Sequence, residues 1–339
     1  MPKFQKRASY PLYEEKVHKL NGCHINLQNL PKLRRGYFYK EQIDPGGDAP
    51  KSFIRLYEYG ECRRDAPKNW IPYIAKVGHK WYPLESITEY LMNQIGEVLG
   101  LNMAKSKLVL AGGQVRFLSR YFLDMKKGEQ LTHGAQIYAR HLDDEKFVEE
   151  ANHRKRKDIT PELFNFKFTE EAIRSIFPEQ HKEILQDFVS MLIFDAIVGN
   201  NDRHFYNWGV ITDLFGKTPP RFSPIYDTAR GLFWNVTEAK IKGYEKSESK
   251  LEKYILSTKP RIGWEGNTGL DHFQLIEKLF FEDGRYCRSC ERLVNKTALA
   301  HIIHLFDNTF IELMSSERLA LIKRCIKLRM DKLQNIILS

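Results

Sequence analysis

The stretch Asn200-Asn201-Asp202-Arg203-His204-Phe205-Tyr206-Asn207-Trp208-Gly209 decides how this chain is interpreted. It contains an acid, Asp202, and an amide, Asn207, five positions later, with a basic pair between them. That spacing fits a phosphoryl-transfer loop, in which the acid orients a substrate hydroxyl and accepts its proton while the amide oxygen binds magnesium. The apolar run 188–198 precedes it, and Gly199 is a typical helix stop. We therefore expect a buried helix that delivers Asp202 to a loop.

A second metal ligand is expected downstream, and Pro224-Ile225-Tyr226-Asp227 provides one at about the distance of a hairpin. Its apolar residues predict a strand, and the Asp227 carboxylate would lie where that strand enters a cleft. Taken alone, Asp202 and Asn207 also fit a solvated turn, because Asn-Asn-Asp is typical of turns. Together with Asp227 they match the acid, amide and metal-binding acid of a protein kinase.

Composition narrows the class of protein. With 339 residues, 42% hydrophobic and 28% charged, the chain can form one large domain or two lobes. No apolar run is long enough to span a membrane, and the charged residues 1–7 are not followed by a signal-like apolar segment. Five cysteines, an odd number, favour reduced thiols in the cytoplasm. We interpret the CxxC of Cys287 and Cys290 as two free thiols, because no second pair stands at zinc-site spacing.

The net charge of +10 favours an acidic partner, such as nucleotide phosphates, nucleic acid or a membrane surface. The densest basic run, residues 153–157, lacks the interleaved aromatic residues of an RNA-binding face. We interpret this run as a solvated loop. A nucleic-acid role is therefore expected only indirectly, if at all, and no membrane role is expected.

The pattern of predicted elements changes near residue 124. Before it, the predicted strands and single helix lie at 52–59, 73–77, 87–98, 108–111 and 115–122. After it, helical spacing dominates, at 169–176, 181–198, 298–312 and 316–337. We predict an α+β, bilobal fold of the protein-kinase type, with a strand-rich lobe at residues 1–123 and a helical lobe at 124–339. The nucleotide would bind between them.

Such a fold needs a strand lysine for the phosphates and a helix carboxylate that holds it. Lys76 ends the second predicted strand and Glu89 lies in the following helix, with Lys80 and Glu85 as rival candidates. We favour Lys76 because strand alternation turns it inward. The Gly46-Gly47 loop before the first strand fits a phosphate-covering loop.

The apparent Gly216-Lys217-Thr218 is not a Walker A loop. That motif requires a glycine five residues before its Gly-Lys pair, and Ile211 stands there.

The order of these motifs resembles the HipA-like serine/threonine kinases. The specific matches are N-x-D-R-H-x-x-N-W-G at 200–209 and P-x-Y-D at 224–227. Softer matches are G-x-x-P-K at 47–51, Lys76, Glu89 and the hinge-like segment 118–121, and the likeness spans roughly residues 44–330.

The resemblance implies ATP and Mg²⁺ as cofactors, with Asp202 as the catalytic base together with Lys76, and with Asn207 and Asp227 as metal ligands. The residues it assigns to the nucleotide site are Gly46, Gly47, Lys51, Lys76, Glu89, Ser119, Tyr121 and His204. It also implies a toxin–antitoxin setting, with an antitoxin as a partner and a component of translation as the protein substrate. Asp44 stands where such kinases often carry a regulatory serine, and Ser52 is displaced, so the likeness does not extend to autophosphorylation of this loop.

Two other functions remain open. Phosphoinositide kinases use a similar D-R-H-x-x-N loop, which allows a lipid or small-molecule kinase, although the chain is small and has no amphipathic membrane-binding segment. A catalytically silent, nucleotide-sensing protein is the other alternative, and the joint presence of Lys76, Asp202, Asn207 and Asp227 weighs against it. Acceptor specificity is expected in residues 228–271, which contain no interpretable motif.

Overall fold

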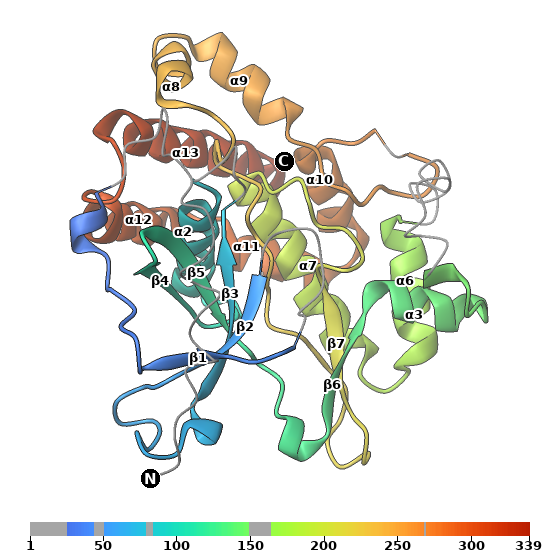
Figure 1. Cartoon of the computed structure of the whole chain (residues 1–339). Coiled ribbons are helices and arrows are strands. Elements are labelled where there is room, and N and C mark those ends of the chain that lie inside the picture. Colours follow the sequence, from blue (N-terminus) through green and yellow to red (C-terminus); the bar gives the residue numbers. More distant parts are fainter. Residues whose placement is uncertain (1–25, 44–50, 79–83, 149–163, 268) are drawn as a thin grey trace.

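The computed structural model describes residues 26–43, 51–78, 84–148, 164–267 and 269–339. A strand-rich N-terminal lobe is followed by a mainly helical C-terminal lobe (Figure 1), which confirms the expected α+β, kinase-like fold class. The predicted features at Asp44, Gly46, Gly47, Lys80 and the basic run 153–157 lie outside the described residues. Within the described part, no helix combines the length and the apolar character needed to cross a membrane.

An antiparallel five-stranded sheet forms the N-terminal lobe, in the order β1-β2-β3-β5-β4. Its strands are β1 (Phe38–Lys40), β2 (Lys51–Leu56), β3 (Ile71–Val77), β4 (Ser106–Ala111) and β5 (Gln114–Arg120). Gly112 and Gly113 have φ angles of 61° and 76°, as the tight turn of a two-residue hairpin requires. The sequence predicted both strands of this hairpin, at 108–111 and 115–122, whereas no strand was predicted at β1.

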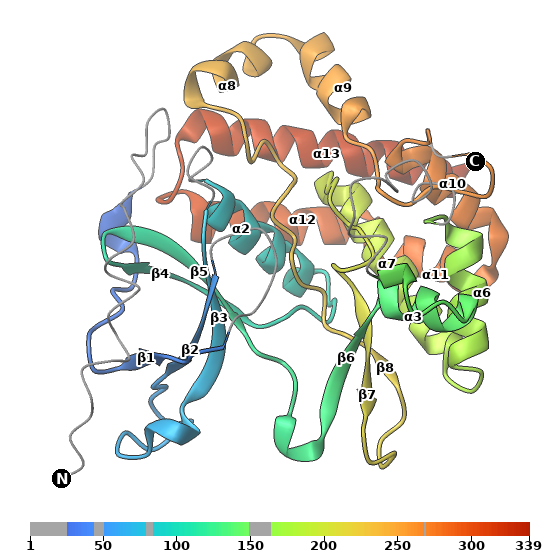
Figure 2. The ribbon, with the colours of Figure 1, turned by 45° about the vertical axis from the view of Figure 1, so that its right-hand side comes forward.

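Helix α2 (Glu85–Val98) lies against this sheet. Ile87, Leu91 and Ile95 recur at helical spacing and are fully buried. On its other side α2 packs against α12 (Lys296–Leu305), a helix from the far end of the chain (Figure 2). The ring centre of Tyr90 on α2 lies 5.8 Å from that of Phe310, which follows α12 in the chain. The C-terminal helices thus hold α2 in place.

Helix α7 (His181–Val198) is the centre of the C-terminal lobe, and all its residues from 188 onward are buried. Among the described residues, this lobe also contains α12 and the helices α3 (Gly134–Leu142), α6 (Phe166–Ile176), α8 (Glu238–Glu245), α9 (Glu248–Ser257), α10 (His272–Glu282), α11 (Gly284–Leu293) and α13 (Ser316–Leu338). Short 3-10 helices lie at Leu27–Asn29, Pro67–Asn69 and Met125–Lys127. Cys287 and Cys290 are free thiols on α11, as predicted.

The helix predicted over 298–312 is not continuous. Helix α12 ends at Leu305 and continues as a π-helical turn, η5 (Phe306–Phe310). This wider turn buries both Phe306 and Phe310 completely. Helical periodicity alone does not indicate such a turn, because the packing of the two rings decides it.

A second antiparallel sheet, which the sequence did not predict, lies between the five-stranded sheet and helices α3 and α6 (Figures 1 and 2). Its strands are β6 (Glu129–His133), β7 (Gly209–Asp213) and β8 (Arg221–Phe222). The β7–β8 hairpin separates the 200–209 loop from Asp227, as expected. The strand predicted before Asp227 is reduced to one bridge, between Met103 and Ile225. The lobe boundary at 123/124 stays a prediction.

Gly134, the first residue of α3, allows Trp208 of the 200–209 loop to pack directly against the helix. A Cβ atom there would lie 2.5 Å from Trp208 Cε2 and 2.9 Å from Phe205 O. We expect Gly134→Ala to lower the free energy of unfolding by about 1–3 kcal/mol through overpacking, measured by urea denaturation. The matched change Gly243→Ala, where the space is open, should raise it by about 0.5–1 kcal/mol. Unchanged stability of Gly134→Ala would contradict this packing.

Candidate active site

The 200–209 loop begins where α7 stops. Gly199 adopts a left-handed φ of 67° and its backbone N–H donates to Asp195 O. A side chain at Gly199 would also crowd Arg329, whose Nη1 lies 3.1 Å from the Cβ position. Glycine therefore ends α7 at the residue the sequence predicted, and it turns the chain into the 200–209 loop.

A buried ion pair between Arg203 and Asp195 organises this loop. Arg203 Nε lies 2.9 Å from Asp195 Oδ2 and Nη2 lies 3.0 Å from Oδ1, a bidentate arrangement. Both side chains are only 2% exposed. The remaining Arg203 nitrogen, Nη1, donates to Asn207 O and to Tyr226 O, each at 2.7 Å. One side chain thus joins α7, the 200–209 loop and the segment that precedes Asp227.

Sequence reasoning did not assign this role to either partner. In the sequence Arg203 is only one of the basic pair between Asp202 and Asn207, whereas the structure buries it. Asp195 carried a usable signal, because it is the single charged residue in the apolar run 188–198. An acid in a buried helix has to be paired or hydrogen-bonded. Asn200 adds to the same cluster, since its Nδ2 donates to Asp195 Oδ1 at 2.8 Å.

Asp202 and Asn207 lie side by side on the loop. Asn207 Nδ2 donates to Asp202 O at 2.8 Å, which leaves Oδ1 as the acceptor of that amide. The Asp202 side chain is 17% exposed. Burial raises its pKa, although Arg230 and His204 oppose the shift. A raised pKa makes this carboxylate a better proton acceptor than an exposed aspartate.

Lys76 of β3 bridges two carboxylates from different elements. Its Nζ lies 2.6 Å from Glu89 Oε1 on α2 and 2.7 Å from Asp227 Oδ1. The lysine side chain is 11% exposed, so it points inward as strand alternation predicted. Glu89 rather than Glu85 is the partner that α2 supplies. Three residues that are far apart in the sequence therefore meet at one ammonium group.

Burial dominates one pKa value in this cluster and neighbouring charges dominate another, so the two values move in opposite directions. Burial raises the pKa of Glu89 to about 7, although Lys76 opposes the shift. Burial would also raise the pKa of Asp227, but Lys76 and Lys51 outweigh it and hold that pKa below its usual range. Lys51 is the first residue of β2 and stands opposite Lys76 in the strand register. Asp227 is therefore ionised at neutral pH.

Asp227 and Asn207 fit a magnesium site by their chemistry. Mg²⁺ prefers oxygen ligands and is commonly bound by one or two protein groups together with phosphate oxygens and water. Asp227 offers an ionised carboxylate that is one-third exposed, and Asn207 offers its free Oδ1. Asp227 has a left-handed φ of 56°, which aspartate tolerates better than most residues do.

His204 stays close to both acids. Its Nδ1 accepts the backbone N–H of Tyr206 at 3.2 Å, so a neutral ring carries its proton on Nε2. Burial lowers the pKa of His204, while Asp202 and Asp227 oppose the shift.

Ser119 and Tyr121, which the resemblance assigns to the nucleotide site, lie at the end of β5 and just after it. Ser119 is inside β5, where it pairs with Ile74 of β3 and Ser106 of β4. The backbone N–H of Tyr121 donates to Pro72 O at 2.9 Å and is not available to a base. The assignment of both residues to the nucleotide site stays a prediction.

A second buried arginine, which sequence reasoning missed, supports the loop from α13. Arg329 Nε donates to Ala196 O at 2.6 Å, and its Nη1 donates to Thr258 Oγ1 at 2.8 Å. Its guanidinium stands 5.2 Å from the ring centre of Phe273. Arg329 thus fixes the end of α7.

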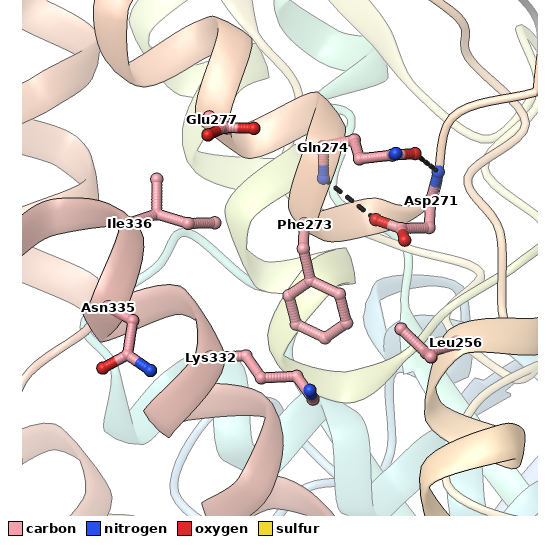
Figure 3. A pocket seen from close by; sticks show the side chains of 8 residues that line it. All are labelled: Leu256, Asp271, Phe273, Gln274, Glu277, Lys332, Asn335 and Ile336. Carbon is pink, nitrogen blue, oxygen red and sulfur yellow. Dashed lines mark hydrogen bonds between the residues drawn. The ribbon is translucent and has the colours of Figure 1, made fainter. Parts of the chain in front are cut away.

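Phe273 also lines a groove of about 260 Å³ between α9, α10 and α13 (Figure 3). This groove shares no residue with the Lys76–Asp202 cluster.

Removing one partner of the Arg203–Asp195 pair leaves a buried charge without its counter-ion. We expect Asp195→Asn to lower the free energy of unfolding by about 3–5 kcal/mol, measured by urea denaturation. The control Asp65→Asn breaks the exposed Arg63–Asp65 pair, in which the side chains are 81% and 68% exposed. It should leave the free energy of unfolding almost unchanged, because an exposed ion pair contributes little to stability. Equal effects of the two substitutions would show that the pair contributes no buried anchor.

Comparisons with known proteins agree with this architecture. The chain aligns over 91% of its length with the crystal structure of the proinflammatory kinase CtkA of Helicobacter pylori, and covers 99% of that chain at a TM-score of 0.71 and 16% identity. HipA of Shewanella oneidensis MR-1, solved with HipB and operator DNA, gives a TM-score of 0.48 at 14% identity, with 90% of this chain and 65% of that one covered. A search of curated proteins found no match.

At 16% identity the likeness to CtkA establishes the fold alone. The sequence comparison goes further, because the family described as the HipA-like C-terminal domain matches residues 43–299. The match includes β2, Lys76, Glu89, the 200–209 loop and Asp227. The chain therefore belongs to the HipA-like family, as its motifs indicated.

Proposed function

We propose that this chain is a kinase that uses ATP and Mg²⁺ to phosphorylate a serine or threonine hydroxyl of a protein. The observation that carries the proposal is the placement of Lys76 between Glu89 and Asp227. A strand lysine held by a helix glutamate is the arrangement with which protein kinases position nucleotide phosphates. Membership of the HipA-like family supports it.

Asp202 is the group that receives the acceptor hydroxyl. Its carboxylate orients the hydroxyl and takes its proton while the oxygen bonds to the γ-phosphorus and the bond to the β–γ bridging oxygen breaks, releasing ADP. Burial keeps the carboxylate basic enough for this step. Arg203 holds the loop against α7, because it pairs with the Asp195 carboxylate and donates to Asn207 O.

Lys76 contributes a fixed positive charge beside the phosphates, and Lys51 adds a second one at the start of β2. Asn207 Oδ1 and the Asp227 carboxylate would hold the metal ion, which when bound neutralises charge on the phosphates. Because all these groups are positioned by buried contacts, little reorganisation is needed when the substrates bind.

A component of translation as the substrate and an antitoxin as the partner stay predictions from the family resemblance.

Replacing the proposed base should separate binding from chemistry. We expect Asp202→Asn to lower the rate of phosphoryl transfer by about 10²–10⁴-fold, while ATP binding is largely kept because Lys76 and Asp227 are intact. Transfer would be followed with γ-labelled ATP and a protein extract, and ATP binding by calorimetry. The control Asp307→Asn, in a surface ion pair, should leave both unchanged. Equal transfer by Asp202→Asn and the parent would remove Asp202 from its role.

The acidic side of the pH–rate profile should report Asp202, because a protonated carboxyl cannot accept the hydroxyl proton. Arg230 lowers the pKa of Asp202, so its removal raises that pKa. We therefore expect Arg230→Gln to move the loss of activity on acidification to higher pH. Arg174→Gln, on the surface of α6, should not move it. A shift to lower pH, or none, would contradict the assignment.

A further inference from the structure

Two arginines, from segments in which the sequence shows no motif, converge on the Asp202 carboxylate. Arg230 Nε lies 3.2 Å from Asp202 Oδ2, and Arg261 Nη2 lies 3.6 Å from Oδ1. Arg230 follows Asp227 by three residues, and Arg261 lies in the connection after α9. Both fall within residues 228–271, where acceptor specificity was expected.

Both arginines are anchored to Asn201, the residue before Asp202. The backbone N–H of Asn201 donates to Arg230 O at 3.1 Å, and Arg261 Nε donates to Asn201 O at 3.2 Å. The Arg230 guanidinium also lies over the ring of Trp234, 5.4 Å from its centre. These contacts fix two cationic groups at the point where an acceptor hydroxyl has to arrive.

The positive charge at this point exceeds what Asp202 neutralises. Two guanidinium groups face one carboxylate, and neither makes the bidentate contact that Arg203 makes with Asp195. Their side chains are 41% and 58% exposed, whereas that of Arg203 is 2% exposed. Since a guanidinium carries five N–H donors in a planar fork, both groups keep donors directed to solvent.

We propose that Arg230 and Arg261 bind an acidic side chain of the acceptor protein, so that the enzyme selects hydroxyls flanked by aspartate or glutamate. This inference rests on the proposed kinase function. Both guanidiniums lie at the Asp202 carboxylate, so an acceptor whose hydroxyl reaches Asp202 also brings the neighbouring residues of its chain close to them. Arginine forks pair readily with carboxylates, and a basic neighbour would be repelled.

A different task for the same arginines is contact with the transferred phosphoryl group. In that case their removal slows transfer to every acceptor equally, and the flanking residues have no influence. The two roles are therefore separated by a ratio of rates on two acceptors, not by the rate on either one.

The experiment compares two serine peptides that differ only in the residues next to the serine, aspartate in one and the isosteric asparagine in the other. For the parent protein we expect kcat/KM to be about tenfold higher for the aspartate peptide, the value of one charge-assisted contact. In Arg230→Gln and Arg261→Gln the ratio should fall towards one. The control Arg174→Gln, which removes an arginine that is 60% exposed, should keep the ratio of the parent.

Binding gives a second measurement that does not depend on turnover. Fluorescein-labelled versions of the two peptides are titrated with the full chain in the presence of Mg²⁺ and a non-hydrolysable ATP analogue. The aspartate peptide should bind the parent about tenfold more tightly, and this advantage should shrink at high salt. Asp202→Asn should bind it more tightly still, because both guanidiniums lose their carboxylate.

The outcomes separate the inference from the function beneath it. Equal binding of both peptides, or an advantage that survives in Arg230→Gln and Arg261→Gln, overturns the acidic-acceptor site whether or not transfer occurs. A parent that selects the aspartate peptide in binding but transfers no phosphate supports the site and counts against the kinase function. A uniform loss of transfer in both arginine variants, with an unchanged ratio, assigns them to the phosphoryl group instead.

Discussion

The buried pair of Arg203 and Asp195 is the interaction on which the candidate site depends. Charges removed from water must be paired and hydrogen-bonded, and this guanidinium meets that demand with partners from three segments at once. Two contacts go to α7, one to the backbone of Asn207 and one to that of Tyr226. Because the requirement is satisfied in a single arrangement, the loop that carries Asp202 and the segment that carries Asp227 are held at a fixed separation.

Helix α2, which carries Glu89, is held in place by packing rather than by charge. Helix α2 lies between the five-stranded sheet and α12, so Glu89 cannot move away from Lys76 without opening an apolar contact. The last helices of the chain therefore contribute to the N-terminal lobe. Lys76 connects these two parts of the site, since its ammonium group pairs with Glu89 of α2 and with Asp227. Electrostatics and packing thus converge on one ammonium group.

Much of the fold was accessible from local patterns. Three local signals are present in the structure. They are the glycine pair of the β4–β5 hairpin, the apolar run of α7 that ends at Gly199, and the apolar face of α13. The strands β1, β6, β7 and β8 were not predicted, because segments of two to five residues carry too little periodicity. The π-helical turn after α12 was missed for another reason, since it arises from the packing of two phenylalanine rings.

The sequence by itself determined which chemical groups the site contains: Asp202, Asn207, Asp227, Lys76 and Glu89 stand in an order and spacing that a kinase fold requires. It could not determine which charges are buried. The local sequence shows neither the burial of Arg203 nor the pairing of Arg230 and Arg261 with Asp202. Burial and pairing depend on contacts between residues that are distant in the chain. Only the tertiary structure placed Arg203 in the interior as an anchor and left Arg230 and Arg261 partly exposed beside Asp202.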